Sequence, residues 1–498
     1  MFILSIDQGT TSTRAIVYDA AGSKLGQAAK ELTQYYPQPG WVEHDPEEIW
    51  NAVRETVPAA LTEAQIEPRQ IAGIGVTNQR ETVVLWDRVS GMPLARAIVW
   101  QDRRTTSFCR ELQSDNRWLN ERTGLVLDPY FSATKIRWLL DANPDWRARA
   151  QRGELACGTI DSFLIWRLTG GRHVTDVTNA SRTLLLNLVN RTWDDELCQY
   201  FNVPRSLLPT VLPSAAEFGF TRGLDFLPDG LALAGVAGDQ QAALFGQAAF
   251  EAGESKCTYG TGAFFLLHTG ASPVLSKHGL LTTVAAMPDA APQYAIEGAV
   301  FIAGAAVQWL RDGLRLFGTA EASERLAQEA DPEQPTMFVP SFVGLGAPHW
   351  VPEARAALFG LTRNTGPAEL ARATLEGVAF QVADLIEAAG HDAATPLSEL
   401  RVDGGMSRNA WFLQTQANVL GLPVLQAQHS ESTALGAAFL AGLQSKVWRS
   451  LDDLRRIAAG SRRFEPAWPV EEQRKRGQQW KRAVRAVIDY YTSSSESR

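Results

Sequence analysis

Residues 2–18 read FILSIDQGTTSTRAIVY, two short apolar runs joined by a polar turn around Gly9. The runs at 2–6 and 13–18 predict the two strands of a hairpin, because glycine permits a tight backbone turn between them. Consecutive N–H groups and hydroxyls in the turn can surround phosphate oxygens. Taken alone, the stretch also fits a plain hairpin turn whose hydroxyls bond to local backbone groups.

The same design returns in the second half of the chain. Residues 256–259 and 263–268 again predict strands, and Gly260-Thr261-Gly262 separates them. Two facing turns of this kind can hold a polyphosphate from both sides of a cleft. The repetition predicts two related domains, residues 1–248 and 249–498. The polar residues 493–498 are expected to form a disordered tail.

Strands and helices alternate between and after the two hairpins. A helix is expected at 46–64, opened by Asp45 as N-cap, and strands at 71–76 and 82–86. Further helices are expected near 301–314 and 368–388, and a further strand at 400–403. This alternation favours an α/β fold.

Composition excludes several classes of protein. A chain of 498 residues is too long for one hydrophobic core. Its net charge is −8 and its basic residues form no blocks, which argues against a nucleic-acid partner. No run reaches the roughly 18 apolar residues that a membrane span needs, so no membrane insertion is expected. The four cysteines lie far apart without a CxxC pair, which is typical of reduced thiols in a cytoplasmic protein.

A third segment, residues 402–409, reads Val-Asp-Gly-Gly-Met-Ser-Arg-Asn. Two glycines after a strand let the backbone approach a flat ligand, and Asn409 could then hydrogen-bond a base. A loop in which Ser407 or Asn409 caps the next helix is the alternative. The motifs GxxxxGK(S/T), GxGxxG, HExxH and GxSxG do not occur, so P-loop kinases, Rossmann dehydrogenases, zincins and α/β-hydrolases lose support.

The three segments resemble the phosphate-1, phosphate-2 and adenosine elements of the actin, hexokinase and Hsp70 superfamily. Within it the chain is identified as a member of the FGGY carbohydrate kinases, and it is similar to those members that phosphorylate glycerol. The resemblance covers roughly residues 1 to 445. Its longest stretches are YYPQPGWVEHDPEEIW from Tyr35, GVTNQRETVVLWDR from Gly75, TGLVLDPYFSATKIRW from Thr123, TDVTNASRTLL from Thr175, AGDQQAALFGQ from Ala237 and EGAVFIAGAAVQWLRDGL from Glu297.

This resemblance implies two duplicated actin-like (ribonuclease H-like) domains, each a mixed sheet flanked by helices, with the active site in the cleft between them. It implies transfer of the γ-phosphoryl group of ATP to glycerol, yielding sn-glycerol 3-phosphate and ADP. Its implied glycerol-binding residues are Arg80, Glu81, Trp100, Tyr130, Asp239, Gln240 and Phe264. Since successive strand side chains face opposite ways, the neighbours Arg80 and Glu81 can reach one ligand only at a strand end or turn.

Asp239 is implied to be the general base that takes the proton from the attacking hydroxyl. Because phosphoryl transfer depends mainly on positioning and electrostatics, a carboxylate within hydrogen-bond reach suffices. Read by itself, Asp239 before an apolar helical run also fits a helix N-cap that faces solvent.

The resemblance also implies the nucleotide site. The residues that would contact ATP or ADP are Thr10, Thr11, Ser12, Arg14, Thr261, Gly304, Gln308, Gly405 and Asn409. Asp7 would hold Mg²⁺ through water, an ion that favours carboxylates and retained waters. For Gly304 and Gln308, helix packing and a solvated polar face are the alternative.

Departures from the family pattern are few: His349, Val351 and Ala356 stand where the family usually has Tyr, Asp and Gly. Two other functions stay open from the residues. One is a related kinase acting on a longer polyol or ketose, and the other is an inactive relative that binds nucleotide and regulates a partner. Family members are commonly dimers or tetramers, so a homodimer or homotetramer is expected.

Overall fold

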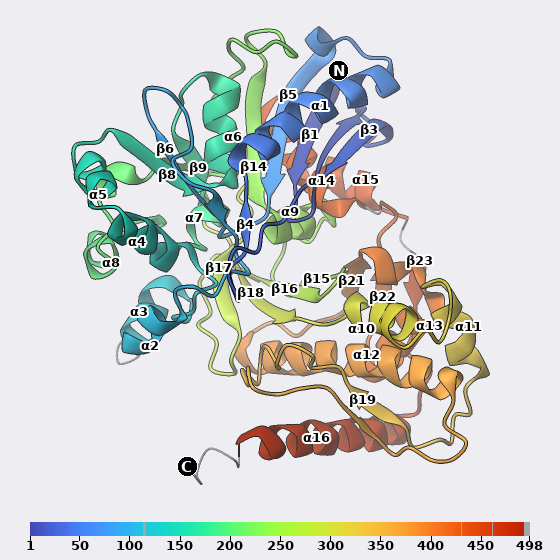
Figure 1. The fold of residues 1–498 in the computed structure, drawn as a ribbon. Coiled ribbons are helices and arrows are strands. Elements are labelled where there is room, and N and C mark those ends of the chain that lie inside the picture. The colour runs from blue at the N-terminus through green and yellow to red at the C-terminus, as the bar shows by residue number, and fades with distance from the viewer. Residues whose placement is uncertain (113–115, 430, 461, 493–498) are drawn as a thin grey trace.

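The computed structural model describes residues 1–112, 116–429, 431–460 and 462–492, which form two lobes stacked one above the other (Figure 1). The expected tail at 493–498 lies outside the described residues. A six-stranded mixed sheet forms the centre of the first lobe. Its strands lie in the order β13 (Ala215–Phe220), β14 (Ala232–Gly238), β5 (Ile71–Asn78), β1 (Phe2–Gln8), β2 (Ser12–Tyr18) and β3 (Lys24–Glu31).

A seven-stranded mixed sheet forms the centre of the second lobe. Its order is β17 (Leu281–Val284), β18 (Tyr294–Val300), β16 (Ala263–Gly270), β15 (Ser255–Tyr259), β21 (Leu400–Asp403), β22 (Val424–Gln426) and β23 (Arg462–Phe464). The series β3–β2–β1–β5–β14 and β18–β16–β15–β21–β22 share both order and polarity: two antiparallel pairs followed by two parallel pairs. The predicted duplication of an α/β unit is therefore confirmed.

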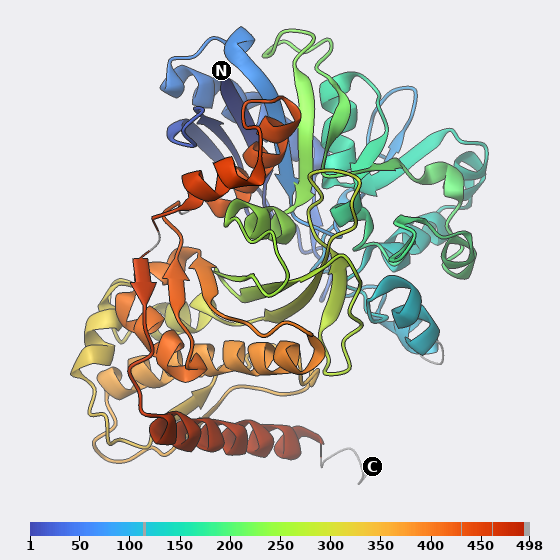
Figure 2. The same ribbon diagram turned by 180° about the vertical axis from the view of Figure 1, so that it is seen from behind.

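The first sheet is covered on both faces. Leu4 and Ile6 of β1 face a core with α1 (Pro46–Ala64) and α6 (Ile160–Thr169). Ile3, whose side chain points the opposite way, packs with α9 (Asp239–Gly246), α14 (Ser432–Gln444) and α15 (Leu451–Ala458). Although α14 and α15 come late in the chain, they lie against the first sheet, as Figure 2 shows from behind.

The second sheet packs its outer face on long helices. Cys257, Tyr259, Phe265 and Leu267 meet α12 (Pro367–Asp392), α13 (Ala410–Leu420) and α16 (Val470–Thr492) in one core. On the opposite face Leu266 packs against Leu244 of α9. Because α9 is buried between both sheets, its first residue lies where the lobes meet.

A smaller four-stranded sheet extends the first lobe, in the order β4 (Glu43–His44), β7 (Ala97–Ile98), β6 (Val83–Asp87) and β8 (Leu155–Thr159). The remaining helices of this region are α2 (Thr106–Glu111), α3 (Asn116–Thr123), α4 (Ser132–Ala142), α5 (Pro144–Gln151), α7 (Val177–Ala180) and α8 (Asp195–Tyr200). Short two-stranded pairs join β9 (Val174–Asp176) to β12 (Thr210–Leu212), β10 (Leu186–Asn187) to β11 (Thr192–Trp193), and β19 (Met337–Val339) to β20 (Ala357–Phe359).

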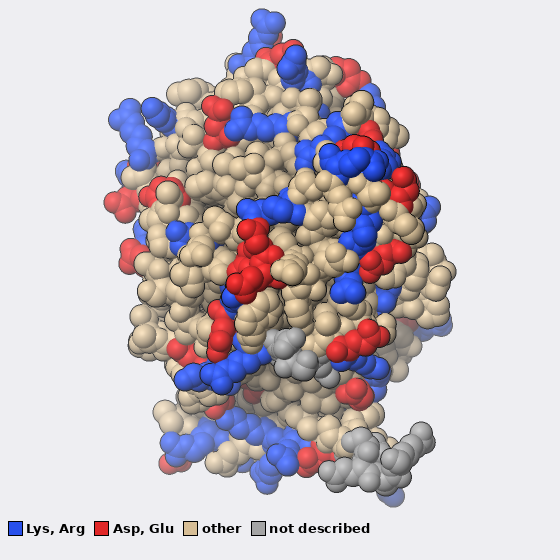
Figure 3. All heavy atoms as spheres, turned by 90° about the vertical axis from the view of Figure 1, so that its left-hand side faces the viewer, with Lys and Arg blue, Asp and Glu red and all other residues tan. Residues whose placement is uncertain are grey.

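The elements expected from sequence are present. The helix at 46–64 begins where predicted, because the Asp45 side chain accepts a hydrogen bond from the Glu47 N–H. The expected helix near 301–314 is α10 (Gly304–Gln308) followed by a π-helical turn at Trp309–Gly313. All four cysteines are free and buried. No helix in the described ranges has the length and apolar character to cross a bilayer. On the face in Figure 3, acidic and basic side chains are intermingled.

Candidate active site

The turn between β5 and β6 carries Arg80 and Glu81. Glu81 has a φ of 60°, a left-handed backbone conformation that is uncommon for a residue with a side chain. This conformation breaks the strand alternation, and both neighbouring side chains are buried at the junction of the lobes. The expectation that the pair lies in a turn is confirmed.

Arg80 is the centre of a buried ion-pair network. Its Nη1 and Nη2 donate to the two carboxylate oxygens of Glu297, at 2.5 and 2.8 Å, and its Nε lies 3.1 Å from Asp239 Oδ1. Arg182 Nε donates to Glu81 Oε1 at 2.6 Å, and Arg182 Nη2 to Glu297 Oε1 at 3.3 Å. The network therefore joins two predicted substrate residues to the predicted general base.

Charge pairing sets the protonation of this network. Burial alone would raise the pKa of Glu297, but the guanidinium groups of Arg182 and Arg80 outweigh it and lower the pKa to about 2. Glu297 is therefore an anion at neutral pH. Burial raises the pKa of the Tyr130 phenol, which keeps that hydroxyl neutral and able to donate a hydrogen bond.

Aromatic rings form the apolar wall beside the network. Trp100 lies edge-on to Tyr130 at 5.6 Å between ring centroids, and to Phe264 at 6.5 Å. A pocket between the lobes is lined by these three rings together with Glu297. The Trp100 indole N–H donates to Thr10 Oγ1 at 2.9 Å. The wall is thus fixed to the first glycine–threonine turn.

Asp239 is the first residue of α9, and Gly238 occupies the N-cap position. The alternative prediction, that Asp239 is the N-cap of this helix, is therefore wrong. The carboxylate is about 30% exposed, which leaves it accessible to a substrate. The neighbouring Gln240 accepts a hydrogen bond through Oε1 from the buried Lys256 Nζ. Lys256 Nζ also donates to the Phe264 carbonyl at 3.2 Å.

Asp7 lies near the end of β1 on the face that meets α9. Burial is the largest cause that raises the pKa of its carboxyl; with the opposing effect of Arg14 and the smaller upward effects of Asp239 and Glu431, the pKa is about 7. Carboxylates gathered this way favour a bound cation. Within the described ranges no group of three or more His, Cys, Asp or Glu side chains is arranged to enclose a metal. The site therefore fits an ion such as Mg²⁺, which typically takes one or two carboxylates, waters and substrate phosphates.

Of the predicted phosphate residues, Thr10 and Thr11 lie in the first turn, Ser12 and Arg14 lie at the start of β2, and Thr261 lies in the second turn. In the first turn the Gly9 N–H donates to the Ser12 carbonyl at 2.9 Å, and Thr11 is exposed. Arg14 pairs with Glu431, Nη1 to Oε2, at 2.7 Å. In the second turn the Thr261 carbonyl accepts from the N–H groups of Ala303 and Ala305.

The second turn, α10 and the adenosine segment meet closely. A Cβ on Gly304 would lie 2.5 Å from the Gly260 carbonyl oxygen, and a Cβ on Gly404 would lie 2.4 Å from the Tyr259 carbonyl oxygen. Only glycine permits these approaches, and Gly404 also has a φ of 89°. The second turn, α10 and the segment that begins at Gly404, all predicted to contact nucleotide, therefore meet at the turn of the β15–β16 hairpin.

The other residues predicted to contact the nucleoside are Asn409, Gly405 and Gln308. Asn409 caps α13, since its Oδ1 accepts from the Phe412 N–H at 2.8 Å, so the alternative prediction that Asn409 caps the next helix is confirmed. Gly405 opens a 3-10 turn, with open space where a Cβ would be. Gln308 is exposed at the end of α10.

Family models match both halves of the chain: the N-terminal domain of the FGGY family of carbohydrate kinases over residues 2–246, and its C-terminal domain over residues 255–445. The chain belongs to the FGGY family of carbohydrate kinases. A glycerol kinase from Allorhizobium ampelinum is 52% identical over 98% of this chain and 99% of its own length.

Solved structures agree with this assignment. A Plasmodium falciparum glycerol kinase with ADP superposes with a TM-score of 0.92 at 37% identity, covering 98% of both chains. A ligand-bound xylulose kinase from Lactobacillus acidophilus, at 24% identity and a TM-score of 0.86 over 99% of this chain and all of its own, shares the fold.

Sequence reasoning missed three charged residues of this FGGY kinase site: Arg182, Lys256 and Glu297. A signal was present for two of them, Glu297 and Lys256. Glu297 is the one acidic residue in the strand sequence YAIEGAV, and Lys256 begins the second hairpin. A charge in a buried strand needs a charged or hydrogen-bonded partner, so such residues are candidates for a buried network.

The loop with the family departures borders the site. His349 Nε2 lies 3.3 Å from Asp384 Oδ2, and Ala347 and Trp350 contribute to the pocket wall.

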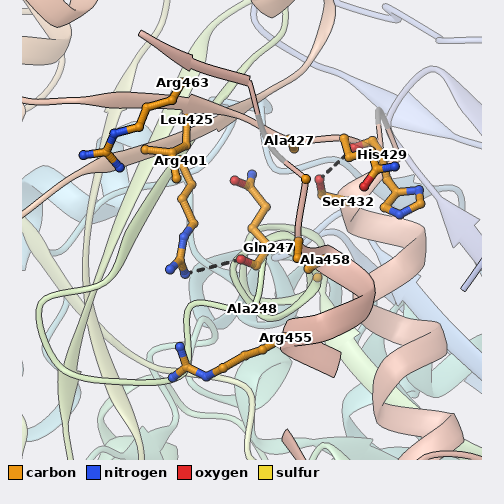
Figure 4. Close-up of a pocket in the computed structure, with 14 residues that line it drawn as sticks. Gln247, Ala248, Arg401, Leu425, Ala427, His429, Ser432, Arg455, Ala458 and Arg463 are labelled. Atoms are coloured by element: carbon orange, nitrogen blue, oxygen red, sulfur yellow. Dashed lines mark hydrogen bonds between the residues drawn. The ribbon is translucent and has the colours of Figure 1, made fainter. Parts of the chain in front are cut away.

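A separate cavity of about 330 Å³ lies where the lobes join, lined by Arg401, Arg455, Arg463 and Gln247 (Figure 4). Glutamates Glu251, Glu254 and Glu399 pair with the three guanidinium groups, so the cavity presents no uncompensated positive charge.

Proposed function

We propose that this FGGY kinase transfers the γ-phosphoryl group of ATP to a terminal hydroxyl of glycerol, producing sn-glycerol 3-phosphate and ADP. The observation that carries the proposal is that the aromatic pocket of Trp100, Tyr130 and Phe264 shares Glu297 with the ion-pair network that holds Arg80, Glu81 and Asp239. Glycerol needs several hydrogen-bonding groups and a little apolar surface, which this pocket combines. The 52% identity to a named glycerol kinase supports the same substrate.

In the proposed reaction Asp239 takes the proton as the hydroxyl oxygen attacks the γ-phosphorus and the bond to the ADP oxygen breaks. The Arg80 and Gln240 contacts of the carboxylate are made by Oδ1. We therefore assign proton acceptance to Oδ2. Arg80 and Glu81 hold the glycerol hydroxyls with Tyr130 and Gln240, and Trp100 and Phe264 cover its C–H face, which also excludes water.

The two turns and the adenosine segment hold the nucleotide in this proposal. Hydroxyls and N–H groups of Thr10, Thr11, Ser12 and Thr261 bind phosphate oxygens, with Arg14 as counter-charge. Gly304, Gln308, Gly405 and Asn409 line the nucleoside. Asp7 would hold Mg²⁺ through water, and an ion there would supply positive charge to the phosphates during transfer.

A kinase panel over glycerol, dihydroxyacetone, erythritol, D-xylulose and L-ribulose tests the substrate. We expect glycerol to have the highest kcat/KM. Preference for a pentulose by more than about tenfold, or about 1.4 kcal/mol in transition-state binding, would replace glycerol as the substrate. Absence of transfer to all five would favour a regulatory nucleotide-binding protein.

We further propose that the enzyme works in the cytoplasm as a homodimer or homotetramer. The four reduced, buried cysteines fit that compartment. The assembly rests on family resemblance, and light scattering coupled to size-exclusion chromatography measures it directly.

A further inference from the structure

The charged network under the glycerol pocket crosses from one lobe to the other. Arg80 and Glu81 lie after β5, and Arg182 follows α7, all in the first lobe. Glu297 comes from β18 of the second sheet, where it pairs in register with Leu266 of β16. β16 is the second strand of the hairpin that carries the Gly260-Thr261-Gly262 turn. Glu297 is therefore rigidly connected to a predicted phosphate-binding element.

The carboxylate of Glu297 is shared between two cations. Arg80 uses a two-pronged contact at 2.5 and 2.8 Å, and Arg182 adds a third contact at 3.3 Å. Such a fork-to-fork contact fixes the plane of the Arg80 guanidinium as well as its position. Arg182 in turn holds Glu81 at 2.6 Å. The Glu297 side chain therefore holds Arg80 directly and holds Glu81 through Arg182.

Because these side chains are buried, loss of the Glu297 contacts would be energetically costly. The four side chains of Arg80, Glu81, Arg182 and Glu297 are each at most 2% exposed. Removing one partner from a buried ion pair leaves a charge without compensation, so the remaining groups must move toward other partners or water. For Arg80 the other acceptors in reach are Gln241 Oε1, 3.2 Å from Nη1, and the carboxylate of Asp239, whose Oδ1 lies 3.1 Å from Nε. A freed Arg80 would draw that carboxylate away from its position beside the substrate.

We propose that Glu297 is a positioning residue of the glycerol site: from the second lobe it holds Arg80 and Arg182, and through them sets the geometry of Glu81 and Asp239. The inference rests on the proposed function and deepens it. Although Glu297 borders the aromatic pocket, both of its carboxylate oxygens are engaged by Arg80 and Arg182, and the role proposed for it is exerted through these two side chains. Because Glu297 belongs to the second lobe and its partners belong to the first, glycerol binding depends on how the two lobes pack against each other.

Kinetics of Glu297→Gln test the proposal. Glutamine keeps the size of the side chain but removes the charge and one acceptor. We expect KM for glycerol to rise at least tenfold while KM for MgATP stays within about threefold, because the nucleotide turns keep their own contacts. Glu297→Asp keeps the charge but is one methylene shorter, so it should have an intermediate KM for glycerol.

Glu376→Gln is the matched control. Glu376 is also a buried carboxylate in the second lobe bridging two arginines, Arg372 at 2.9 Å and Arg476 at 3.1 Å, and it lies in α12. A loss of a buried two-arginine bridge in general would affect both variants alike. A positioning role predicts that only Glu297→Gln changes KM for glycerol.

Should Glu297→Gln fail to fold, the double variant Arg182→Met, Glu297→Gln removes one buried cation together with the anion. It is expected to have a higher thermal midpoint than Glu297→Gln, because the net charge of the network is restored although Glu81 loses its contact with Arg182, and still to show the raised KM for glycerol. An unchanged KM for glycerol in a folded Glu297→Gln or double variant overturns the positioning role alone. A wild-type enzyme that does not phosphorylate glycerol overturns the proposed function, and the positioning role with it.

Discussion

Gly436 lies at the closest approach between α14 and α9, and its replacement by alanine is expected to damage both stability and catalysis. A Cβ at Gly436 would lie 1.8 Å from the Ala242 carbonyl oxygen, and a Cβ at Gly246 would lie 2.0 Å from the Ser432 carbonyl oxygen. Normal carbon–oxygen contact begins at about 3.4 Å, so the helices must separate by roughly 1.5 Å. Both carbonyl oxygens belong to the backbone, so no rotamer change can relieve the contact.

The cost follows from this displacement. Overpacking in a core typically costs about 1–3 kcal/mol, and we expect the upper end because backbone has to move. α9 begins at Asp239, so the same shift moves the proposed general base. A misplacement of about 1 Å can cost on the order of 100-fold in rate. Gly436→Ala should therefore lower both the unfolding midpoint and kcat.

Gly477→Ala is a control that is expected to raise stability instead of lowering it. Gly477 lies inside α16 with open space where a Cβ would be. Alanine there should stabilise the helix by about 1 kcal/mol through helix propensity and leave kcat unchanged. Differential scanning calorimetry and a coupled ADP assay measure both quantities. A Gly436→Ala enzyme with wild-type midpoint and kcat would refute the close contact.

Three further predictions concern single aspartates. Asp239→Asn should lower kcat by at least about 100-fold while glycerol still binds in calorimetry; substantial residual kcat would contradict the general-base role. Removing Mg²⁺ with a chelator should abolish transfer, and Asp7→Asn should raise the Mg²⁺ concentration for half-maximal rate, whereas an unchanged requirement would place the ion elsewhere. Burial raises the pKa of Asp161 to about 7. Between the lower pKa of the unfolded state and about pH 7, the folded state therefore keeps a proton that the unfolded state has released. The free energy of unfolding falls as pH rises through this range. Between pH 6 and 8 this loss amounts to about 1.4 kcal/mol, and Asp161→Asn should lessen the fall in thermal midpoint over that interval; an equal fall in both proteins would count against it.

Much of the fold was predictable because local signals agree with the tertiary structure. The hairpins have apolar strands of the right length and turns whose residues allow them, and α1 has its cap at Asp45 and a buried stripe. The sheet against which α14 packs was not predictable in the same way. Its sequence is apolar nearly all round, which indicates burial but does not say against which sheet.

For the site, sequence supplied residues by resemblance and chemistry, and the structure shows which of them meet. Arg80 and Asp239 are far apart in the chain, and only the folding of β5 and α9 to one edge brings their side chains to 3.1 Å. The role of Glu297 escaped sequence reasoning because one acid in a strand does not reveal which cations face it. Its partners come from the other lobe, at separations of more than 100 residues.

The return of α14 to the first sheet has a consequence for biosynthesis. Gly75 of β5 and Gly235 of β14 leave room for its backbone, since a Cβ on either would lie within 2.4 Å of it. Until residues 432–444 have left the ribosome, α9 is the helix of this core that can cover that apolar face, and it covers only part of it. The amino-terminal half must therefore wait, exposed to chaperones and proteases, for nearly the whole chain to be translated.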